Sequence, residues 1–225
     1  MNPTFKNTIL QKTKKVILDT LFPISCLSCG KTDVWLCKNC LNKISQKNNQ
    51  VCPYCEKMIT PNGYTCFACK KKYSLDGLLV ASSYKDRVIS KAIHLYKYRF
   101  AEELSSPLGD IIIKSIKNSE LPLPDIIIPV PLHPRRLRWR GFNQSELLAK
   151  HISEKITIGF PIPIINDLLQ RSRYTHPQME IKNQLRRKRN IENAFKITKN
   201  KLTLVKSKRI LLVDDVATTG ATIFE

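Results

Sequence analysis

The sequence predicts an α/β domain built on a mainly parallel sheet, preceded by a small cysteine-rich module. Two observations support this prediction. From about residue 76 onward, short apolar runs typical of buried strands alternate with segments of helical periodicity, which indicates parallel strands joined by helices. All eight cysteines lie in the first part of the chain, in four Cys-x-x-Cys pairs. We therefore place the boundary between the two parts near residues 72–76.

Residues 1–23 predict an amphipathic helix, because their apolar positions, among them Phe5, Ile9 and Val16, recur near helical spacing. Several lysines in the same stretch interrupt the hydrophobic core that a signal peptide needs. No run in the sequence reaches the roughly 18 apolar residues of a membrane span. We expect a cytoplasmic protein, with peripheral attachment at the inner membrane as the alternative.

Residues 24–72 predict a double zinc-binding module. Two thiolates separated by two residues can turn toward one ion, and four thiolates complete a tetrahedral zinc site. Eight thiolates therefore indicate two structural zinc ions. Pairing in sequence order assigns the first four cysteines to one ion and the last four to the other, and a cross-braced pairing is the alternative. The expected ligands are Cys26, Cys29, Cys37, Cys40, Cys52, Cys55, Cys66 and Cys69.

The cysteines admit three other interpretations. A disulfide framework requires secretion, for which the sequence carries no signal. The segment Cys52-Pro-Tyr-Cys55 resembles a glutaredoxin dithiol, but that motif belongs in a βαβ unit and here it lies among three other pairs. Iron–sulfur ligation uses the same thiolates, and spacing leaves it open. Zinc is the interpretation that we favour.

The second part of the chain, residues 76–225, predicts alternating strands and helices. The strand over residues 125–130 is apolar and is ended by Pro129. The strand over residues 210–213 is apolar throughout and is therefore expected to be fully buried. The remaining expected elements are a strand over 77–84 and helices over 86–98, 102–117 and 145–155.

Two adjacent carboxylates, Asp214 and Asp215, follow the last strand, at the end where open α/β sheets bind their ligands. A Thr-Thr-Gly-Ala-Thr turn over residues 218–222 comes next, with hydroxyls, free amides and a permissive glycine. Such a turn can wrap a phosphate, while the carboxylates can accept hydrogen bonds from ribose hydroxyls. The segment is similar to the phosphoribosyl pyrophosphate (PRPP) loop of type I phosphoribosyltransferases. The alternative is a buried strand that ends in an acidic turn.

The formal net charge of +20 favours a polyanionic partner, either nucleic acid or a phosphorylated small molecule. Residues 135–142 interleave four arginines with Trp139 and Phe142. Arginines beside an aromatic stacking surface suit single-stranded nucleic acid. The same arginines suit a pyrophosphate group, and Trp139 then packs at the base of a loop. The residues expected to bind either ligand are Arg135, Arg136, Arg138, Trp139 and Arg140.

Several motifs occur together and in order: Pro129-Val-Pro-Leu132, Arg140-Gly-Phe-Asn-Gln144, the terminal loop, and the four cysteine pairs at the N-terminal side. Lys97-Tyr-Arg99, Arg173-x-Thr175 and Arg189-Asn190 extend the pattern. With these motifs, nearly the whole chain resembles the ComF (late competence) family.

The resemblance implies a type I phosphoribosyltransferase-like domain behind a double zinc ribbon. It also implies a role in handling single-stranded DNA during natural transformation, with a competence helicase as an expected partner. Because only three residues follow the loop, where a helix and a strand are expected, we expect a domain that is incomplete at its C-terminus.

The resemblance further implies a PRPP ligand bound with Mg²⁺. The residues that it assigns to PRPP are Asp214, Asp215, Thr218, Thr219, Gly220, Ala221 and Thr222. Thr218 occupies the position where purine-salvage enzymes carry an acidic residue, so the proton acceptor of that chemistry is missing. Turnover is therefore left open, and no catalytic residue is assigned. The alternative function is a metabolic phosphoribosyltransferase with an unknown acceptor.

Overall fold

The structure is a computed structural model that describes residues 24–99, 101–175, 189–217 and 220–225. The chain divides into two compact units, Met1–Ile44 and Ser45–Glu225. The amphipathic helix expected over residues 1–23 lies outside the described residues. Within the described part of the chain, no helix is long and apolar enough to cross a membrane.

The first unit is a turn followed by the short helix α2 (Lys38–Lys43). An isolated antiparallel bridge between Ser25 and Thr32 closes the turn. The amide of Gly30 donates to the carbonyl of Cys26 at 2.9 Å, and the left-handed φ of Gly30, 75°, permits this tight reversal. Cys37 stands at the N-cap of α2. The turn and the start of the helix thus each supply one cysteine pair.

The second unit begins with a repeat of the same arrangement. A bridge between Val51 and Ile59 closes a turn that carries one cysteine pair, and the amide of Cys52 donates to the carbonyl of Met58 at 2.8 Å. The second pair starts at Cys66, the N-cap of α3. The helical elements of this repeat are η1 (Pro61–Gly63) and α3 (Phe67–Lys70).

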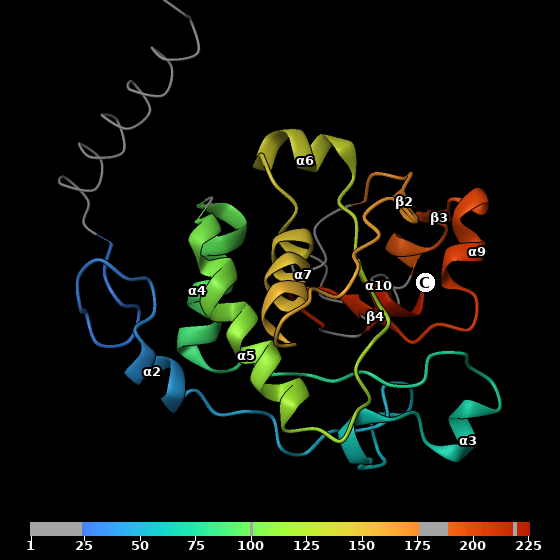
Figure 1. Cartoon of the computed structure of the whole chain (residues 1–225), viewed down its shortest axis with the longest axis horizontal. Helices are drawn as coiled ribbons and strands as arrows, with labels where there is room; N and C mark the ends of the chain where they lie inside the picture. The colour runs from blue at the N-terminus through green and yellow to red at the C-terminus, as the bar shows by residue number, and fades with distance from the viewer. Residues whose placement is uncertain (1–23, 100, 176–188, 218–219) are drawn as a thin grey trace, which may run out of the picture. The chain divides into compact units, whose positions relative to one another are not determined.

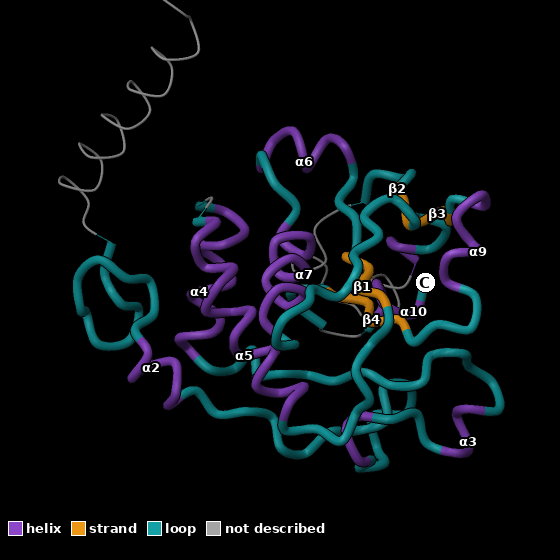
Figure 2. Tube along the Cα trace, viewed as in Figure 1, coloured by secondary structure: helices purple, strands orange, loops and turns teal. Residues whose placement is uncertain are grey.

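A small parallel sheet forms the centre of the α/β part (Figure 2). Strand β1 (Ile126–Pro129) pairs in parallel with β4 (Ile210–Val213), in the register that sets Ile126 opposite Ile210. A further parallel bridge joins Ile127 to Ile164. Separately, β2 (Leu169–Arg171) pairs antiparallel with β3 (Phe195–Ile197). The expectation of a parallel pairing is confirmed for β1 and β4.

Helices cover one face of the sheet (Figure 1). α7 (Gln144–Lys155) packs against β1 and β4, and α5 (Ser105–Lys117), preceded by η2 (Glu102–Leu104), packs against α7. α4 (Arg87–Tyr98) lies beside them (Figure 1). The other described helical elements are α6 (Pro134–Arg140), η4 (Lys199–Lys201), α9 (Leu202–Val205) and α10 (Ala221–Phe224).

Local capping fixes where two of these helices begin. The Asp86 carboxylate accepts hydrogen bonds from the amides of Val88 and Ile89 and starts α4. The Asn143 side chain accepts from the Ser145 amide at 3.2 Å and starts α7. Its amide group also donates to the carbonyl of Val130 at 3.1 Å. Asn143 therefore ties the start of α7 to the end of β1.

The strand expected over residues 77–84 is not formed. Isolated bridges at Gly77 and Ser82 are the backbone pairings found there among the described residues. Between them, the amide side chain of Gln50 donates to the Val80 carbonyl at 2.9 Å and accepts from the Val80 amide at 3.1 Å. A side chain therefore takes the hydrogen-bonding place of a neighbouring strand.

The expectation that residues 210–213 form a fully buried strand is also wrong. Val213 is 4% exposed, but Ile210 is 46% exposed. Within the described chain, β4 pairs only with β1. A cavity of about 500 Å³, lined in part by Ile93 and Ile112, borders the same strand. An apolar strand is fully buried only when other elements cover both of its sides, and one side of β4 is left partly uncovered by the described residues.

Candidate functional site

The carboxyl ends of β1 and β4 bring the two loops that follow them together. The amide of Val130 donates to the carbonyl of Val213 at 2.9 Å, directly before Asp214 and Asp215. Because parallel strands end at the same edge of a sheet, the acidic pair lies beside the loop after β1. The pair thus stands at the edge that the sequence predicts for ligand binding.

Asp215 forms an ion pair with Lys97, which comes from the last turn of α4. The Lys97 Nζ lies 2.9 Å from the Asp215 Oδ1, and the two side chains are 14% and 7% exposed. Burial lowers the pKa of Lys97, but the charges of Asp215 and Asp214 together have a larger, opposite effect, so the net shift of its pKa is upward. Lys97 is therefore charged at neutral pH and neutralises Asp215.

Asp214 lies in a different environment from its neighbour. Its Oδ1 accepts hydrogen bonds from the Ser145 hydroxyl at 3.2 Å and from the Asp215 amide at 2.9 Å. Burial, followed by the charge of Asp215, raises the pKa of Asp214 to about 7, although Lys97 and the hydrogen bonds oppose this. The two carboxylates therefore lie in unequal environments: Asp215 is paired with Lys97, and Asp214 is buried with a raised pKa.

Gln144, the first residue of α7, reaches the same carboxylates. Its Nε2 donates to the Asp215 Oδ2 at 3.4 Å, and its backbone carbonyl accepts from the Tyr96 hydroxyl at 2.9 Å. The residue is 3% exposed, and within the described part of the chain its Oε1 has no hydrogen-bond partner. The site therefore contains a buried acceptor oxygen that no described residue satisfies.

The segment between β1 and α7 is not a simple loop, because it contains α6. Pro134 occupies the first helical turn, where its fixed φ fits, and the His133 side chain accepts from the Arg135 amide at 3.2 Å. Gly141 ends the helix with φ 84°. These capping signals are local, and together they explain why residues 134–140 form a helix.

α6 divides its basic residues between two environments. Arg140 is 7% exposed and stands near the rings of Tyr98 and Trp139, at 5.9 Å and 6.0 Å from their centroids. Burial lowers the pKa of Arg140, while the charge of Asp215 acts in the opposite direction. Arg140 is therefore the buried arginine of α6, and its guanidinium interacts electrostatically with Asp215.

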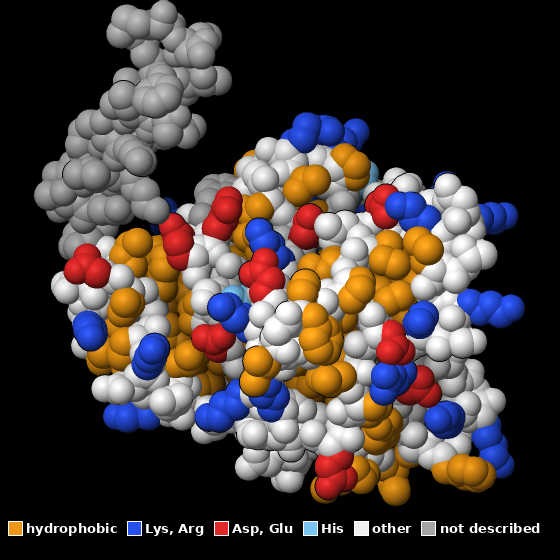
Figure 3. Space-filling model, viewed as in Figure 1, with side chains coloured by type: hydrophobic (Ala, Val, Ile, Leu, Met, Phe, Trp, Pro, Cys, Tyr) orange, Lys and Arg blue, Asp and Glu red, His pale blue; other side chains and the backbone are white. Residues whose placement is uncertain are grey.

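The other residues of α6 form an outer surface, over which Lys and Arg side chains gather in Figure 3. Arg135 and Arg138 are exposed, and Trp139 is 57% exposed. The guanidinium of Arg136 lies 5.6 Å from the Tyr174 ring and donates to the Thr175 carbonyl at 2.7 Å. The five residues expected to bind pyrophosphate or nucleic acid are thus on one helix, but they face different surroundings.

Arg171 is a buried cation that the sequence did not single out. It is 8% exposed, donates to the Thr175 hydroxyl at 2.6 Å and lies 5.2 Å from the Phe195 ring. Burial and the nearby Arg136 lower its pKa to about 10. Lys97 and Gln144 stood in motifs of the sequence but without a role, because nothing local connects them to Asp215.

The turn that follows the acidic pair is described in part. Thr218 and Thr219 lie outside the described residues. Gly220 is buried with φ 65°, and a Cβ there would collide with the Phe224 ring. Tyr54 stacks on that Phe224 ring at 4.6 Å and on Tyr73 at 3.9 Å. An aromatic stack thus connects the end of the turn to the second cysteine repeat, in the same unit.

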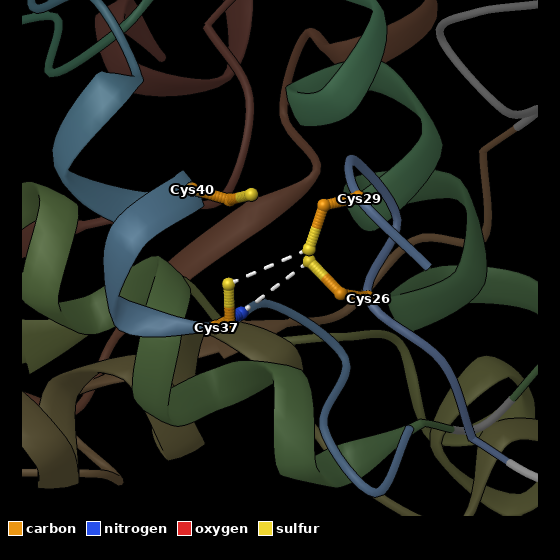
Figure 4. Close-up of side chains that lie close together, drawn as sticks. All are labelled: Cys26, Cys29, Cys37 and Cys40. Atoms are coloured by element: carbon orange, nitrogen blue, oxygen red, sulfur yellow. Dashed lines mark hydrogen bonds between the residues drawn. The ribbon is translucent and has the colours of Figure 1, made fainter. Parts of the chain in front are cut away.

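Both sets of four cysteines converge in sequence order, so the sequential pairing is the one observed. In each set, all four sulfurs lie within 4.8 Å of one another, and all eight thiols are free. In the first set the sulfurs of Cys26, Cys29, Cys37 and Cys40 surround a common centre (Figure 4). Four thiolates without an open position fit a structural zinc ion at each centre.

Backbone amides prepare one thiolate in each set. The amide of Cys37 donates to the Cys26 Sγ at 3.5 Å, and the amide of Cys66 donates to the Cys52 Sγ at 3.4 Å. Burial raises the pKa of Cys26 and Cys52, but hydrogen bonds from these two amides and from neighbouring ones have a larger, opposite effect. The pKa of each thiol is therefore lowered to about 6. A thiolate that is formed easily is suited to binding a metal ion.

Comparison with known protein families and curated proteins gives consistent results. The double zinc ribbon domain matches residues 17–75. The DNA utilization protein YhgH of Shigella flexneri is 31% identical over 194 residues, which cover 84% of this chain and 81% of that protein. Competence protein F of Haemophilus influenzae is 29% identical over 214 residues, 91% of this chain and 89% of that protein. Competence protein ComFC of Bacillus subtilis is 24% identical over 205 residues, covering 86% and 76%. No solved structure matches.

Proposed function

The chain belongs to the ComF family, and from that premise we propose that it handles single-stranded DNA during natural transformation. Two of its relatives are named as competence proteins and one as a DNA utilization protein, which supports a role in the uptake and use of DNA. A competence helicase is the partner that we expect for this role.

The outer surface of α6 is the observation that carries the proposal. Arg135, Arg138 and Trp139 are exposed together on one helical turn and a half. Proteins that bind single strands combine cations for the phosphates with aromatic rings on which bases stack. Trp139 lies edge-on to the Tyr98 ring, with 6.4 Å between the ring centroids, and its remaining exposed surface stands beside two arginines, an arrangement that suits the stacking of a base.

We further propose that residues 76–225 form a phosphoribosyltransferase-like domain that binds PRPP at the acidic pair, behind a zinc ribbon over residues 24–72. Asp214 and Asp215 would accept hydrogen bonds from the ribose hydroxyls, and residues 218–222 would enclose the 5′-phosphate. Arg140, close to the pair, would face the pyrophosphate. Mg²⁺ would neutralise the pyrophosphate charge, held mainly by oxygens of the ligand, since Lys97 already neutralises Asp215.

A metabolic phosphoribosyltransferase with an unidentified acceptor is the second candidate, and one observation favours it. The pKa of Asp214 is raised to about 7, which suits a group that exchanges a proton during turnover near neutral pH. In this alternative the outer surface of α6 would not bind DNA.

A binding panel separates the two candidates. The zinc-loaded full chain is titrated with single-stranded DNA, double-stranded DNA and PRPP with Mg²⁺, each at two salt concentrations. We expect single-stranded DNA to bind with marked salt dependence, because phosphate contacts release counterions. Arg138→Ala and Trp139→Ala should each weaken it, whereas the exposed Lys206→Ala serves as a matched control and should not. Salt-independent DNA binding, or none at low salt, would move the assignment to the metabolic enzyme.

The same panel tests the PRPP site with a variant in which uncharged amides replace both carboxylates. Asp214→Asn combined with Asp215→Asn should abolish PRPP binding, because the ionised acceptors for the ribose hydroxyls are lost. DNA affinity should stay the same or rise slightly, since removing negative charge does not weaken attraction to phosphate. PRPP binding that is unaffected by the double variant would exclude the acidic pair as its site.

A further inference from the structure

We propose that Lys97 is a specificity-determining residue of the acidic pair: its ammonium group occupies the position of a cation at Asp215 and excludes free divalent ions, so that a metal ion enters only together with a phosphate ligand. The inference deepens the proposed function and rests on it for the identity of the phosphate ligand. The exclusion of free divalent ions depends only on the residues of this chain and not on the identity of the phosphate ligand.

The geometry of the ion pair is the first observation. The Lys97 Nζ is 2.9 Å from the Asp215 Oδ1, and both side chains are largely removed from water. Salt and solvent screen such a pair much less than a surface pair. A pair of adjacent carboxylates would ordinarily attract Mg²⁺, which prefers carboxylate oxygens. Here the place beside Asp215 is taken by a charge of the protein itself.

Gln144 supplies an independent observation that a ligand belongs at this pair. Its amide is directed at Asp215, with Nε2 donating to the Oδ2, while its Oε1 is buried and has no partner among the described residues. A buried acceptor without a donor costs free energy, unless a bound molecule satisfies it. A ribose hydroxyl can donate to this oxygen, whereas the Lys97 ammonium is engaged with Asp215.

The local charge balance decides which ligands the site accepts. Lys97 and Arg140 act on Asp215, Lys97 also acts on Asp214, and the buried Arg171 acts on Asp214. A free divalent ion gains little there, because these positive charges of the protein repel it. A metal–pyrophosphate complex carries its own negative charge, which complements Lys97 and Arg140. The site therefore selects the complex over the free ion.

Titration with Mn²⁺ as a probe for divalent ions tests the inference without any phosphate ligand. Loss of the free Mn²⁺ signal in electron paramagnetic resonance is measured for the zinc-loaded wild type, Lys97→Met and Lys97→Gln. We expect both variants to bind one Mn²⁺ at least about tenfold more tightly than the wild type, because one buried repelling charge is removed. Lys91→Met, at an exposed lysine of the same helix, is the matched control and should bind Mn²⁺ as the wild type does.

Two results would overturn the inference. One is a folded, zinc-loaded Lys97→Gln protein that binds Mn²⁺ no more tightly than the wild type. The other needs no lysine variant: wild-type protein that binds Mn²⁺ tightly and loses this binding in Asp214→Asn with Asp215→Asn. Gained Mn²⁺ binding that disappears when Asp214→Asn and Asp215→Asn are added to Lys97→Gln supports it. Because PRPP is absent from the assay, failure of PRPP binding in the separate panel leaves these outcomes unchanged.

Discussion

Replacing Asp214 by asparagine should stabilise the protein above neutral pH. The folded carboxyl has a pKa of about 7, against an ordinary value of 3.8, because it is buried next to the charge of Asp215. The folded state therefore binds this proton more tightly than the unfolded state. As the pH rises from about 4 to about 7, the unfolded state releases this proton while the folded state keeps it, so the wild type becomes less stable, and the full penalty applies above pH 7.

The magnitude follows from the same two values. The interval from 3.8 to about 7 corresponds to about 4 kcal/mol at most, at roughly 1.4 kcal/mol for each pH unit. Relaxation and water around the site reduce this to about 2 kcal/mol, as for an effective dielectric constant well above that of a dry interior. Asparagine keeps the oxygen that accepts from Ser145 and from the Asp215 amide, so the variant loses the charge and little else.

Urea unfolding of the zinc-loaded protein at pH 6, 7 and 8, followed by circular dichroism, measures this effect. Asp214→Asn should be about 2 kcal/mol more stable than the wild type at pH 8, with a smaller difference at pH 6. Glu120→Gln, an exposed carboxylate, is the matched control and should change little at any pH. A difference that does not depend on pH, or a variant less stable at pH 8, would refute the reasoning about the buried carboxyl.

Two further predictions concern the cysteine repeats. Metal analysis of the purified chain should give two zinc ions per molecule. Cys66→Ser with Cys69→Ser should remove one ion and leave the other, because each set of four cysteines converges on its own centre. Loss of both ions would contradict separate centres. Tyr54→Ala should lower the free energy of unfolding by about 2–3 kcal/mol, since it removes two ring contacts of about 0.5–1.5 kcal/mol each and the associated burial. Tyr54→Phe keeps both contacts and loses only the hydrogen bond that the hydroxyl accepts from the Leu75 amide, so an equal loss of unfolding free energy in the two variants would exclude stacking as the cause.

Much of the local structure could be predicted because its signals are local. Asp86 begins α4 and Asn143 begins α7, each through a cap within three residues of the helix start. The limits of α6 follow from local signals in the same way, because Pro134 lies in its first turn and Gly141 ends it. The run over residues 77–84 has the composition of a strand, and only the contact of Gln50 with Val80 shows why it pairs with a side chain instead.

By itself, the sequence determined the eight metal ligands, the parallel character of the sheet and the position of the acidic pair at the end of a strand, whereas the grouping of the cysteines into two sets came from the structure. These depend on spacing and on the alternation of strands and helices, which are properties of short segments. Only the tertiary structure decided that Lys97 neutralises Asp215 and that the Gln144 Oε1 has no hydrogen-bond partner in the part of the chain that the structure describes. Such contacts join residues from separate elements, and burial and charge act through distance in space, which no local pattern records.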